Sequence, residues 1–99
     1  MRELIEEAFE NRDLLKSSEE HRAAVFETVA ALDRGELRVA EKKDGGWRSN
    51  AWVMQAINLY FVLAEMKTIT AGPLEFHDKI PTKKNLAEAG VRVVPPGTI

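Results

Sequence analysis

The stretch AWVMQAINLY, residues 51–60, predicts the helix around which the rest of this chain packs. Apolar side chains recur in it every three or four residues, which is the spacing of one helical face. The members of this face are Trp52, Val53, Ala56, Ile57 and Tyr60. Ser49 or Asn50 precedes the stretch and offers a side chain that can cap its first turn. We therefore expect a central core helix from Ala51 to about Tyr60.

The apolar run continues to Ala64, which raises the question of membrane insertion. It has roughly 14 residues, whereas a helix that spans a bilayer needs about 20. Glu65 and Lys67 follow it directly. We expect a buried helix that ends near Phe61 or Val62, with no membrane partner. Between residues 61 and 70 the helix and strand interpretations compete, because β-branched and aromatic residues are frequent there.

The beginning of the chain predicts a helical hairpin. From Arg2 to about Lys16, apolar side chains recur at the spacing of one helical face and glutamates occupy the other. The apolar positions are Leu4, Ile5, Ala8, Phe9 and Leu15, and the glutamates are Glu3, Glu6, Glu7 and Glu10. A second helix should run from about Ser18 to Arg34. Ser17 and Glu20 have the spacing of a capping box at its start.

The second helix should bury one stripe and stop at Gly35, a residue that readily adopts the left-handed conformation after a final turn. The expected stripe is His21, Val25, Thr28, Val29 and Leu32. Residues 37–42 alternate in character, and Asp44-Gly45-Gly46 is a turn sequence, which together predict a short β-hairpin that continues into Trp47. A two-stranded ribbon is marginal in water, so Trp47 and the Leu37/Val39 face are expected to rest on a helix.

The C-terminal third contains several breaks. Gly72-Pro73 ends whatever element precedes it. Residues 81–88 are expected to form a short helix that stops at Gly90, residues 91–94 to be extended, and Pro95-Pro96 to block further helix or inner strand. The tail from residue 91 to residue 99 is the segment expected to fray. The predicted class is α+β: a small, mainly helical single domain with a helical hairpin, a short β-hairpin and a core helix.

Composition excludes several classes of protein. Fourteen Lys and Arg residues against sixteen Asp and Glu residues give a formal charge of −2, which argues against a nucleic-acid partner. The absence of cysteine excludes disulfides and sulfur-ligated metals and is typical of a reducing compartment. The start at Met1 followed by acidic residues differs from a signal peptide, so a cytoplasmic location is expected.

The sequence contains no recognisable catalytic constellation. His21 and His77 are far apart, and Glu75, His77 and Asp78 are interpreted as a solvated loop, so no metal site is expected. The serines Ser17, Ser18 and Ser49 are interpreted as helix caps, and no nucleophile elbow or phosphate-binding glycine loop is present. No catalytic residue and no bound cofactor are therefore predicted for this chain.

Two groups of residues suggest a binding surface. Lys79, Lys83, Lys84 and Arg92 form a local positive cluster that can attract a dicarboxylate or the phosphates of a coenzyme, although lysines in a solvated loop have the same pattern. Trp47, Trp52, Tyr60 and Phe61 are either an exposed aromatic site or core residues, and their helical spacing favours the core.

Four segments, in order, resemble the amino-terminal region of the tetrahydrodipicolinate N-succinyltransferases. They are GELRVAEK at 35–42, the tryptophan-led helix from Trp52, FHDKIP at 76–81 and GVRVVPP at 90–96. The resemblance covers most of the chain. One departure is at Met54 and Gln55, where the family usually has two lysines, so an anion contact by those lysines is not carried over.

The resemblance implies an acyltransferase of lysine biosynthesis, in which succinyl moves from succinyl-CoA to the amino group of a ring-opened cyclic imine. The family acts as a homotrimer, in clefts between β-helices built from hexapeptide repeats. None of that β-helix is in this chain, so the chain corresponds to an amino-terminal domain, residues 1–99, that is inactive by itself. The general base and the coenzyme contacts would lie in the repeats, and a substrate-binding arginine would follow Pro96.

The resemblance also places the 76–81 loop nearest the cleft. Asp78 and Lys79 of this loop, together with Arg92 of the positive cluster, are the candidate substrate-binding residues. The partner of this domain would be the β-helix domain of its own parent chain. Two other functions stay open: a free-standing helical module that binds a protein, and a small-anion binding domain that uses the positive cluster. The chain alone is expected to be monomeric or weakly associated.

Overall fold

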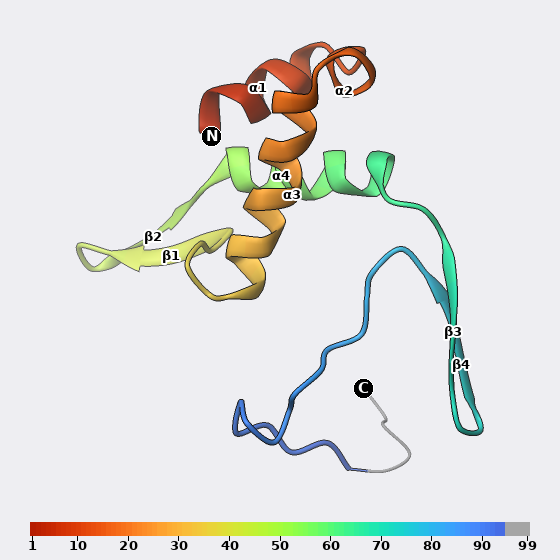
Figure 1. Ribbon diagram of the computed structural model, residues 1–99. Coiled ribbons are helices and arrows are strands. Elements are labelled where there is room, and N and C mark those ends of the chain that lie inside the picture. The colour runs from red at the N-terminus through yellow and green to blue at the C-terminus, as the bar shows by residue number, and fades with distance from the viewer. Residues whose placement is uncertain (95–99) are drawn as a thin grey trace. The chain divides into compact units, whose positions relative to one another are not determined.

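The computed structural model describes residues 1–94, and the chain divides into two compact units, Met1–Glu65 and Met66–Ile99 (Figure 1). The predictions for Pro95, Pro96 and the end of the tail lie outside the described residues. As expected, the architecture combines α-helices with short antiparallel β-hairpins, and the described residues include no β-helix. Each unit is described by itself below.

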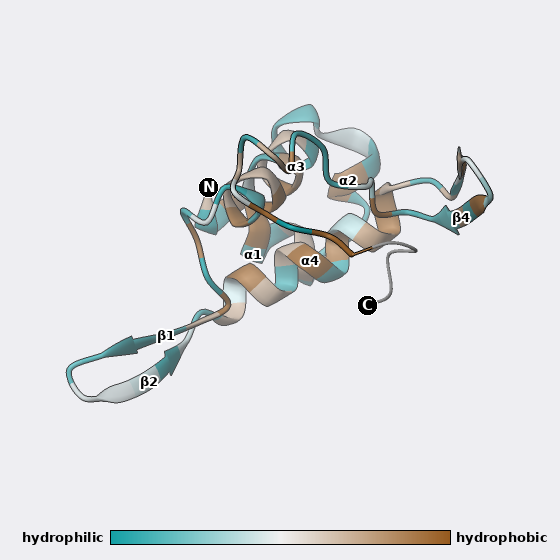
Figure 2. Cartoon of the chain, turned by 90° about the horizontal axis from the view of Figure 1, so that it is seen from below, coloured by the Kyte–Doolittle hydropathy of each residue, from teal (hydrophilic) through white to brown (hydrophobic). Residues whose placement is uncertain are grey.

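Four helices and one hairpin make up the first unit. They are α1 (Arg2–Glu10), α2 (Leu14–Ser17), α3 (Glu19–Asp33), β1 (Ala40–Lys43), β2 (Gly46–Ser49) and α4 (Ala51–Leu63). Both α1 and α3 pack against α4, and α3 runs across it (Figure 1). The hairpin is inserted between α3 and α4 and extends away from the helices (Figure 2).

The predicted central helix is confirmed, and it ends one or two residues later than expected, at Leu63. Its fully buried face consists of Val53, Ala56 and Leu59, while the predicted Trp52, Ile57 and Tyr60 are only half-buried at the edges of that face. Ile5 and Ala8 from α1 and Val25 from α3 complete the centre of the core. Figure 2 shows hydrophobic residues recurring along α4.

The prediction of one helix from Arg2 to Lys16 is wrong, because α1 ends at Glu10. Asn11 adopts an extended conformation, φ −136° and ψ 93°, and its side-chain oxygen accepts a hydrogen bond from the Asp13 N–H at 3.3 Å. Asparagine competes in this way with helical hydrogen bonding. The chain then forms the short α2, and Leu15 still reaches the core, with 3% of its surface exposed.

The start of α3 is one residue later than predicted. Ser18, and not Ser17, is the N-cap, and its side-chain oxygen accepts a hydrogen bond from the His21 N–H. The buried stripe contains His21, Val25 and Thr28 as expected, but Ala24 and Ala31 replace Val29 and Leu32, which are half-buried. Small alanines at these positions let the helices approach closely.

Gly35 ends α3 as predicted. Its φ is +80°, the Glu36 N–H donates to the Ala31 carbonyl at 2.9 Å, and the Gly35 N–H donates to the Leu32 carbonyl at 3.1 Å. These two bonds define a Schellman motif, in which the left-handed residue is almost always glycine.

The first hairpin is confirmed, but its strand begins at Ala40 and not at Leu37. Asp44 and Gly45 both have positive φ, 50° and 79°, as a two-residue type I′ turn requires. The expectation that Trp47 rests on a helix is wrong, because 78% of its surface is exposed. It lies opposite Lys42 on a hairpin that points away from the helices, where no core surface is within reach (Figure 2).

The second unit contains a hairpin that the sequence analysis missed, formed by β3 (Lys67–Ala71) and β4 (Leu74–Asp78). The open question for residues 61–70 is thus answered: helix to Leu63 and strand from Lys67. Gly72, with φ +60°, occupies the first of the two turn positions. The alternation of Thr68, Ile69 and Thr70 before Gly72-Pro73 was the available signal.

The predicted short helix over residues 81–88 is wrong. Residues 81–85 have no regular structure, and residues 86–90 form a hydrogen-bonded turn. Asn85 has a left-handed φ of 56°, which a helix from Pro81 cannot accommodate. Gly90, with φ +72°, does terminate this turn at the predicted position, and residues 91–94 are exposed and lie outside any strand.

Candidate functional site

The three predicted substrate-binding residues all fall in the second unit. Asp78 is the last residue of β4, opposite Lys67. Its carboxylate oxygen Oδ1 accepts a hydrogen bond from the Lys79 backbone N–H at 2.6 Å. Lys79 is half-buried, whereas Asp78, Lys83 and Lys84 are exposed. Asp78 therefore fixes the backbone at the point where the strand ends, and with it the position from which Lys79 extends.

Arg92 reaches this unit through a tight turn. The Val91 N–H donates to the Leu86 carbonyl at 2.8 Å, and the Gly90 N–H donates to the Ala87 carbonyl at 3.1 Å. Lys84 lies two residues before Leu86, and Arg92 lies one residue after Val91. The turn therefore joins a segment that carries the Lys84 ammonium to a segment that carries the Arg92 guanidinium.

This arrangement suits the binding of carboxylates more than it suits covalent chemistry. Lysine presents a point charge, and arginine presents a planar fork of donors that matches a carboxylate. Asp78 would repel a carboxylate, so its contribution is the hydrogen bond that positions Lys79. Because these side chains lie near water, their attraction for an anion is weakened by the high dielectric constant.

A threonine–histidine pair lies on the second hairpin and was not predicted. Thr68 Oγ1 is 2.9 Å from His77 Nδ1, across the two strands. A hydroxyl beside an imidazole is one element of a nucleophile–base pair, but catalysis also needs preorganised donors for the developing oxyanion. Both side chains are exposed. We interpret the pair as a cross-strand contact that stabilises the polar face of this hairpin.

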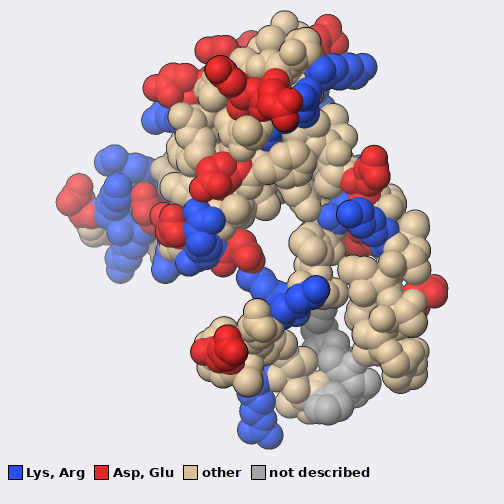
Figure 3. All heavy atoms as spheres, viewed as in Figure 1, with Lys and Arg blue, Asp and Glu red and all other residues tan. Residues whose placement is uncertain are grey.

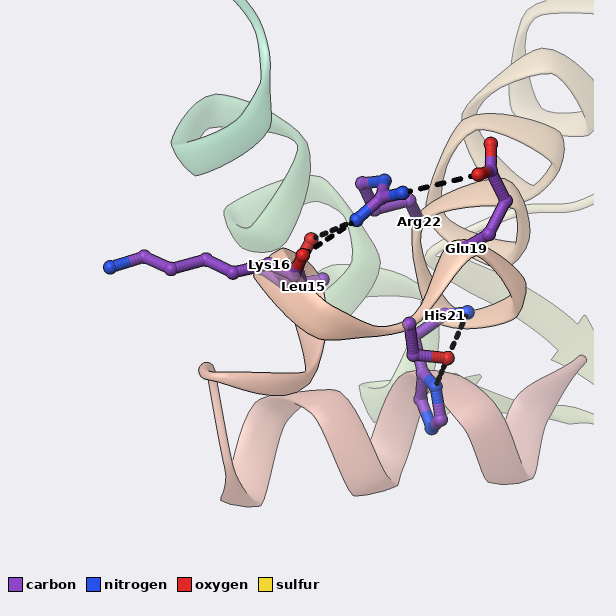
Figure 4. A network of polar contacts seen from close by, with 6 residues as sticks. Leu15, Lys16, Glu19, His21 and Arg22 are labelled. Carbon is purple, nitrogen blue, oxygen red and sulfur yellow. Dashed lines mark hydrogen bonds and ion pairs between the residues drawn. The ribbon is translucent and has the colours of Figure 1, made fainter.

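A buried polar network joins α1 to the start of α3. The His21 ring, with only 8% of the residue exposed, lies 2.6 Å from Ser18 Oγ through Nδ1 (Figure 4). Its Nε2 lies 3.1 Å from Glu7 Oε2. Since Ser18 Oγ also accepts the His21 backbone N–H, its own proton is directed to Nδ1. With Nδ1 accepting from Ser18, Nε2 is the nitrogen that can donate a hydrogen bond to Glu7 Oε2. The network is structural, because Nδ1 binds the N-cap of α3 and Nε2 links α3 to Glu7 of α1.

Arg22 forms a second structural clamp beside this network. Its Nη1 donates to the carbonyls of Leu15 and Lys16 at 2.9 and 3.1 Å, and its Nη2 contacts Glu19 Oε2 at 3.3 Å (Figure 4). The last carbonyls of a helix have no partner within the helix. Arg22 thus satisfies the end of α2 and is an unsuitable candidate for ligand binding.

Basic side chains gather on the first hairpin, which carries Lys42, Lys43 and Arg48 (Figure 3). Lys42 lies directly opposite the exposed Trp47. A hydrogen bond from Asn50, and secondarily one from Lys43, lowers the pKa of Glu41. At the end of α3, the hydrogen bond from Arg34 likewise lowers the pKa of Glu36 and raises that of Arg34. These groups are all charged near neutrality, so none is suited to proton transfer there.

The positions that depart from the family pattern, Met54 and Gln55, lie on α4. Met54 is 46% exposed. The side-chain oxygen of Gln55 is buried and accepts no hydrogen bond within residues 1–94. Neither side chain can supply the positive charge that a lysine would bring to an anion.

Two further kinds of site are a metal centre and a membrane-spanning helix. Among residues 1–94, no three His, Asp or Glu side chains come together in a way that could hold a metal ion. None of the helices in this described part of the chain combines the length and the apolar character needed to cross a membrane.

Comparison with known sequences gives consistent matches. Residues 1–63 match the family described as tetrahydrodipicolinate N-succinyltransferase N-terminal. Three similar proteins are 2,3,4,5-tetrahydropyridine-2,6-dicarboxylate N-succinyltransferases. That of Azoarcus sp. is 44% identical over 105 residues, that of Coxiella burnetii 41% over 102, and that of Acinetobacter baylyi 45% over 102.

The matches extend over nearly the whole chain but over little of the relatives. They cover 97%, 96% and 94% of this chain, and 38%, 38% and 37% of the respective relatives. The chain thus spans little more than a third of the length of the proteins that it resembles. The second unit, which begins after the part matched by the family, is included in these alignments.

Proposed function

Because this chain belongs to the tetrahydrodipicolinate N-succinyltransferase N-terminal family, we propose that it is the amino-terminal accessory domain, residues 1–99, of an N-succinyltransferase. The full-length enzyme would transfer succinyl from succinyl-CoA to an amino-dicarboxylate in the diaminopimelate route to lysine, in the cytoplasm. The observation that carries the proposal is identity of 41–45% along almost the entire chain, including the second unit.

In this proposal the chemistry resides outside the chain. The described residues provide helical packing, two hairpins and a positive segment. The buried His21 is engaged in structural hydrogen bonds. The resemblance implies that succinyl-CoA and the general base meet in a β-helix of hexapeptide repeats, and that the enzyme is a homotrimer. The accessory domain would pack against the β-helix of its own parent chain and help to shape the substrate cleft.

The accessory domain would contribute positive charge to substrate binding. The acceptor is a dicarboxylate, and Lys79 and Arg92 carry the complementary charge. Asp78 supports this role because its Oδ1 accepts a hydrogen bond from the Lys79 backbone N–H at 2.6 Å. Residues of this kind raise affinity for the substrate without taking part in bond making, because they interact equally with the ground state and the transition state.

The function is tested with purified full-length protein. We expect release of coenzyme A that depends on both succinyl-CoA and tetrahydrodipicolinate, whereas the chain of residues 1–99 should release none. A full-length protein that binds but does not transfer succinyl would contradict the proposal. So would transfer by residues 1–99 alone.

Replacing Lys79 with Ala in the full-length enzyme should raise the KM for the dicarboxylate roughly 5- to 10-fold and leave kcat nearly unchanged. The reason is that the substitution removes about 1 kcal/mol of binding energy that the substrate and the transition state share equally. Steady-state kinetics with each substrate varied in turn provides the measurement. Lys16→Ala, which removes an exposed lysine of α2, is the matched control and should change neither constant. An unchanged KM in the Lys79 variant would remove Lys79 from the binding site.

A further inference from the structure

The second unit lacks a core within its described residues. From residue 66 to residue 94 every side chain is exposed, apart from the half-buried Ile69, Lys79 and Leu86, and the buried core residues all belong to Met1–Glu65. An isolated two-stranded ribbon is marginal in water and needs a packing partner. The β3–β4 hairpin therefore needs a surface that covers it.

The strand register shows which side of the hairpin would be covered. Residues directly opposite each other share a face, and faces alternate along each strand. The pairs Ile69↔Phe76 and Ala71↔Leu74 fall on one face, and Thr68↔His77 and Thr70↔Glu75 on the other. We call the first set, Ile69, Ala71, Leu74 and Phe76, the apolar hairpin face.

The apolar hairpin face is open to solvent in this chain. Phe76 is 42% exposed and Leu74 is 37% exposed, and Ile80, just beyond β4, is 55% exposed. The charged pair Lys67↔Asp78 closes the face at one end. An apolar centre with a charged rim is the usual composition of a protein–protein contact. The opposite face, with its Thr68–His77 contact, is suited to water.

We propose that the apolar hairpin face is the docking surface for the polypeptide that follows residue 99 in the full-length protein. Three relatives extend well beyond the matched region, which covers only 37–38% of their length. The family that matches this chain is an amino-terminal one, so the remainder follows it. The second unit is the part of the chain that adjoins this remainder in sequence. The inference rests on the proposed function, in that it takes the chain to be part of a longer enzyme.

Photo-crosslinking in the full-length protein tests which surface covers the face. p-Benzoylphenylalanine replaces Phe76, a substitution of similar shape, and in a control protein it replaces Glu75 on the polar face. After irradiation, crosslinked peptides are identified by mass spectrometry, and a mixture of ¹⁵N-labelled and unlabelled protein distinguishes one copy from two. We expect position 76 to crosslink to residues beyond 99, and position 75 to give far less product.

Two results would overturn the inference. One is a crosslink from position 76 to residues 1–94 of the same or a second copy, which would identify the first unit or another hairpin as the partner. The other is a yield from position 76 no higher than that from position 75, which would mean an uncovered face.

Thiol labelling gives an independent measurement. In the full-length protein, Leu74→Cys should react with a maleimide roughly tenfold more slowly than Glu75→Cys, because the first thiol is covered and the second is not. Labelling is followed on the peptide that contains these positions, so other cysteines do not interfere. Equal rates would contradict the inference.

The succinyl-transfer assay on the unsubstituted full-length protein separates the two proposals. Transfer together with equal labelling rates would reject the docking surface and keep the function. Protection of position 74 in a protein that transfers no succinyl would reject the function and keep the docking surface.

Discussion

Leu59→Ala is expected to lower the free energy of unfolding of this chain by about 3 kcal/mol, within the range of 2 to 5 kcal/mol usual for a buried leucine. Leu59 has no exposed surface and packs in the cluster that contains Ile5, Ala8 and Val25. It lies on α4, which contacts both α1 and α3. A cavity here would therefore weaken the packing of three helices at once.

The control for this variant is Val62→Ala on the same helix. Val62 is 53% exposed, so its truncation should change the free energy of unfolding by no more than about 0.5 kcal/mol. Urea unfolding followed by circular dichroism at 222 nm gives both values, and an unchanged slope with denaturant confirms that only stability has moved. Equal losses in the two variants would mean that α4 does not present its Leu59 side to the core.

The helices could be predicted because each long one buries a face whose period is visible in the sequence. The C-terminus of the core helix was placed to within two residues, and Gly35 was assigned as the end of α3 from its conformational freedom. The division of a buried stripe between large and small residues was not predictable. Ala24 and Ala31 are buried where Val29 and Leu32 were expected, because the closeness of the neighbouring helix, and not hydrophobicity, decides this.

The errors arise where short polar segments choose between competing local structures. Asn11 ends α1 through a side-chain hydrogen bond that no periodic pattern reveals. The β3–β4 hairpin has its apolar residues on one face only. Its short alternating pattern directly follows the apolar run of α4, so the helix and strand interpretations competed there. Trp47 was expected to rest on a helix because a two-stranded ribbon is marginal in water, yet it is 78% exposed, since the direction of a hairpin depends on what surrounds it in the folded protein.

The candidate site could be predicted only as a set of residues. Sequence placed Asp78, Lys79 and Arg92 in one segment, and the structure adds that Asp78 holds the Lys79 backbone and that a tight turn precedes Arg92. A cleft needs walls, and between residues 66 and 94 nearly all side chains of the second unit are exposed. By our proposal those walls belong to the polypeptide beyond residue 99, so no treatment of this sequence alone would have produced them.

The adjacent serines at the start of α3 should respond very differently to substitution. Ser18→Ala removes the N-cap side chain, worth about 1 kcal/mol, and leaves the buried Nδ1 of His21 without its partner at 2.6 Å, which costs a further 1 to 2 kcal/mol or so. We expect a total loss of about 2 to 3 kcal/mol in urea unfolding. Ser17→Ala removes only an exposed bond to the Asp13 carbonyl and should cost about 0.5 kcal/mol or less.

A conservative variant shows whether the hydroxyl itself is responsible. Ser18→Thr keeps an oxygen that can cap the helix and donate to His21, so it should recover most of the loss, whereas a purely steric effect would make it as damaging as alanine. Far-UV circular dichroism follows the loss of the helices during unfolding, and α3 is the longest helix among the described residues. If Ser17→Ala were the more damaging substitution, α3 would begin one residue earlier, and the capping box first expected from Ser17 and Glu20 would be correct after all.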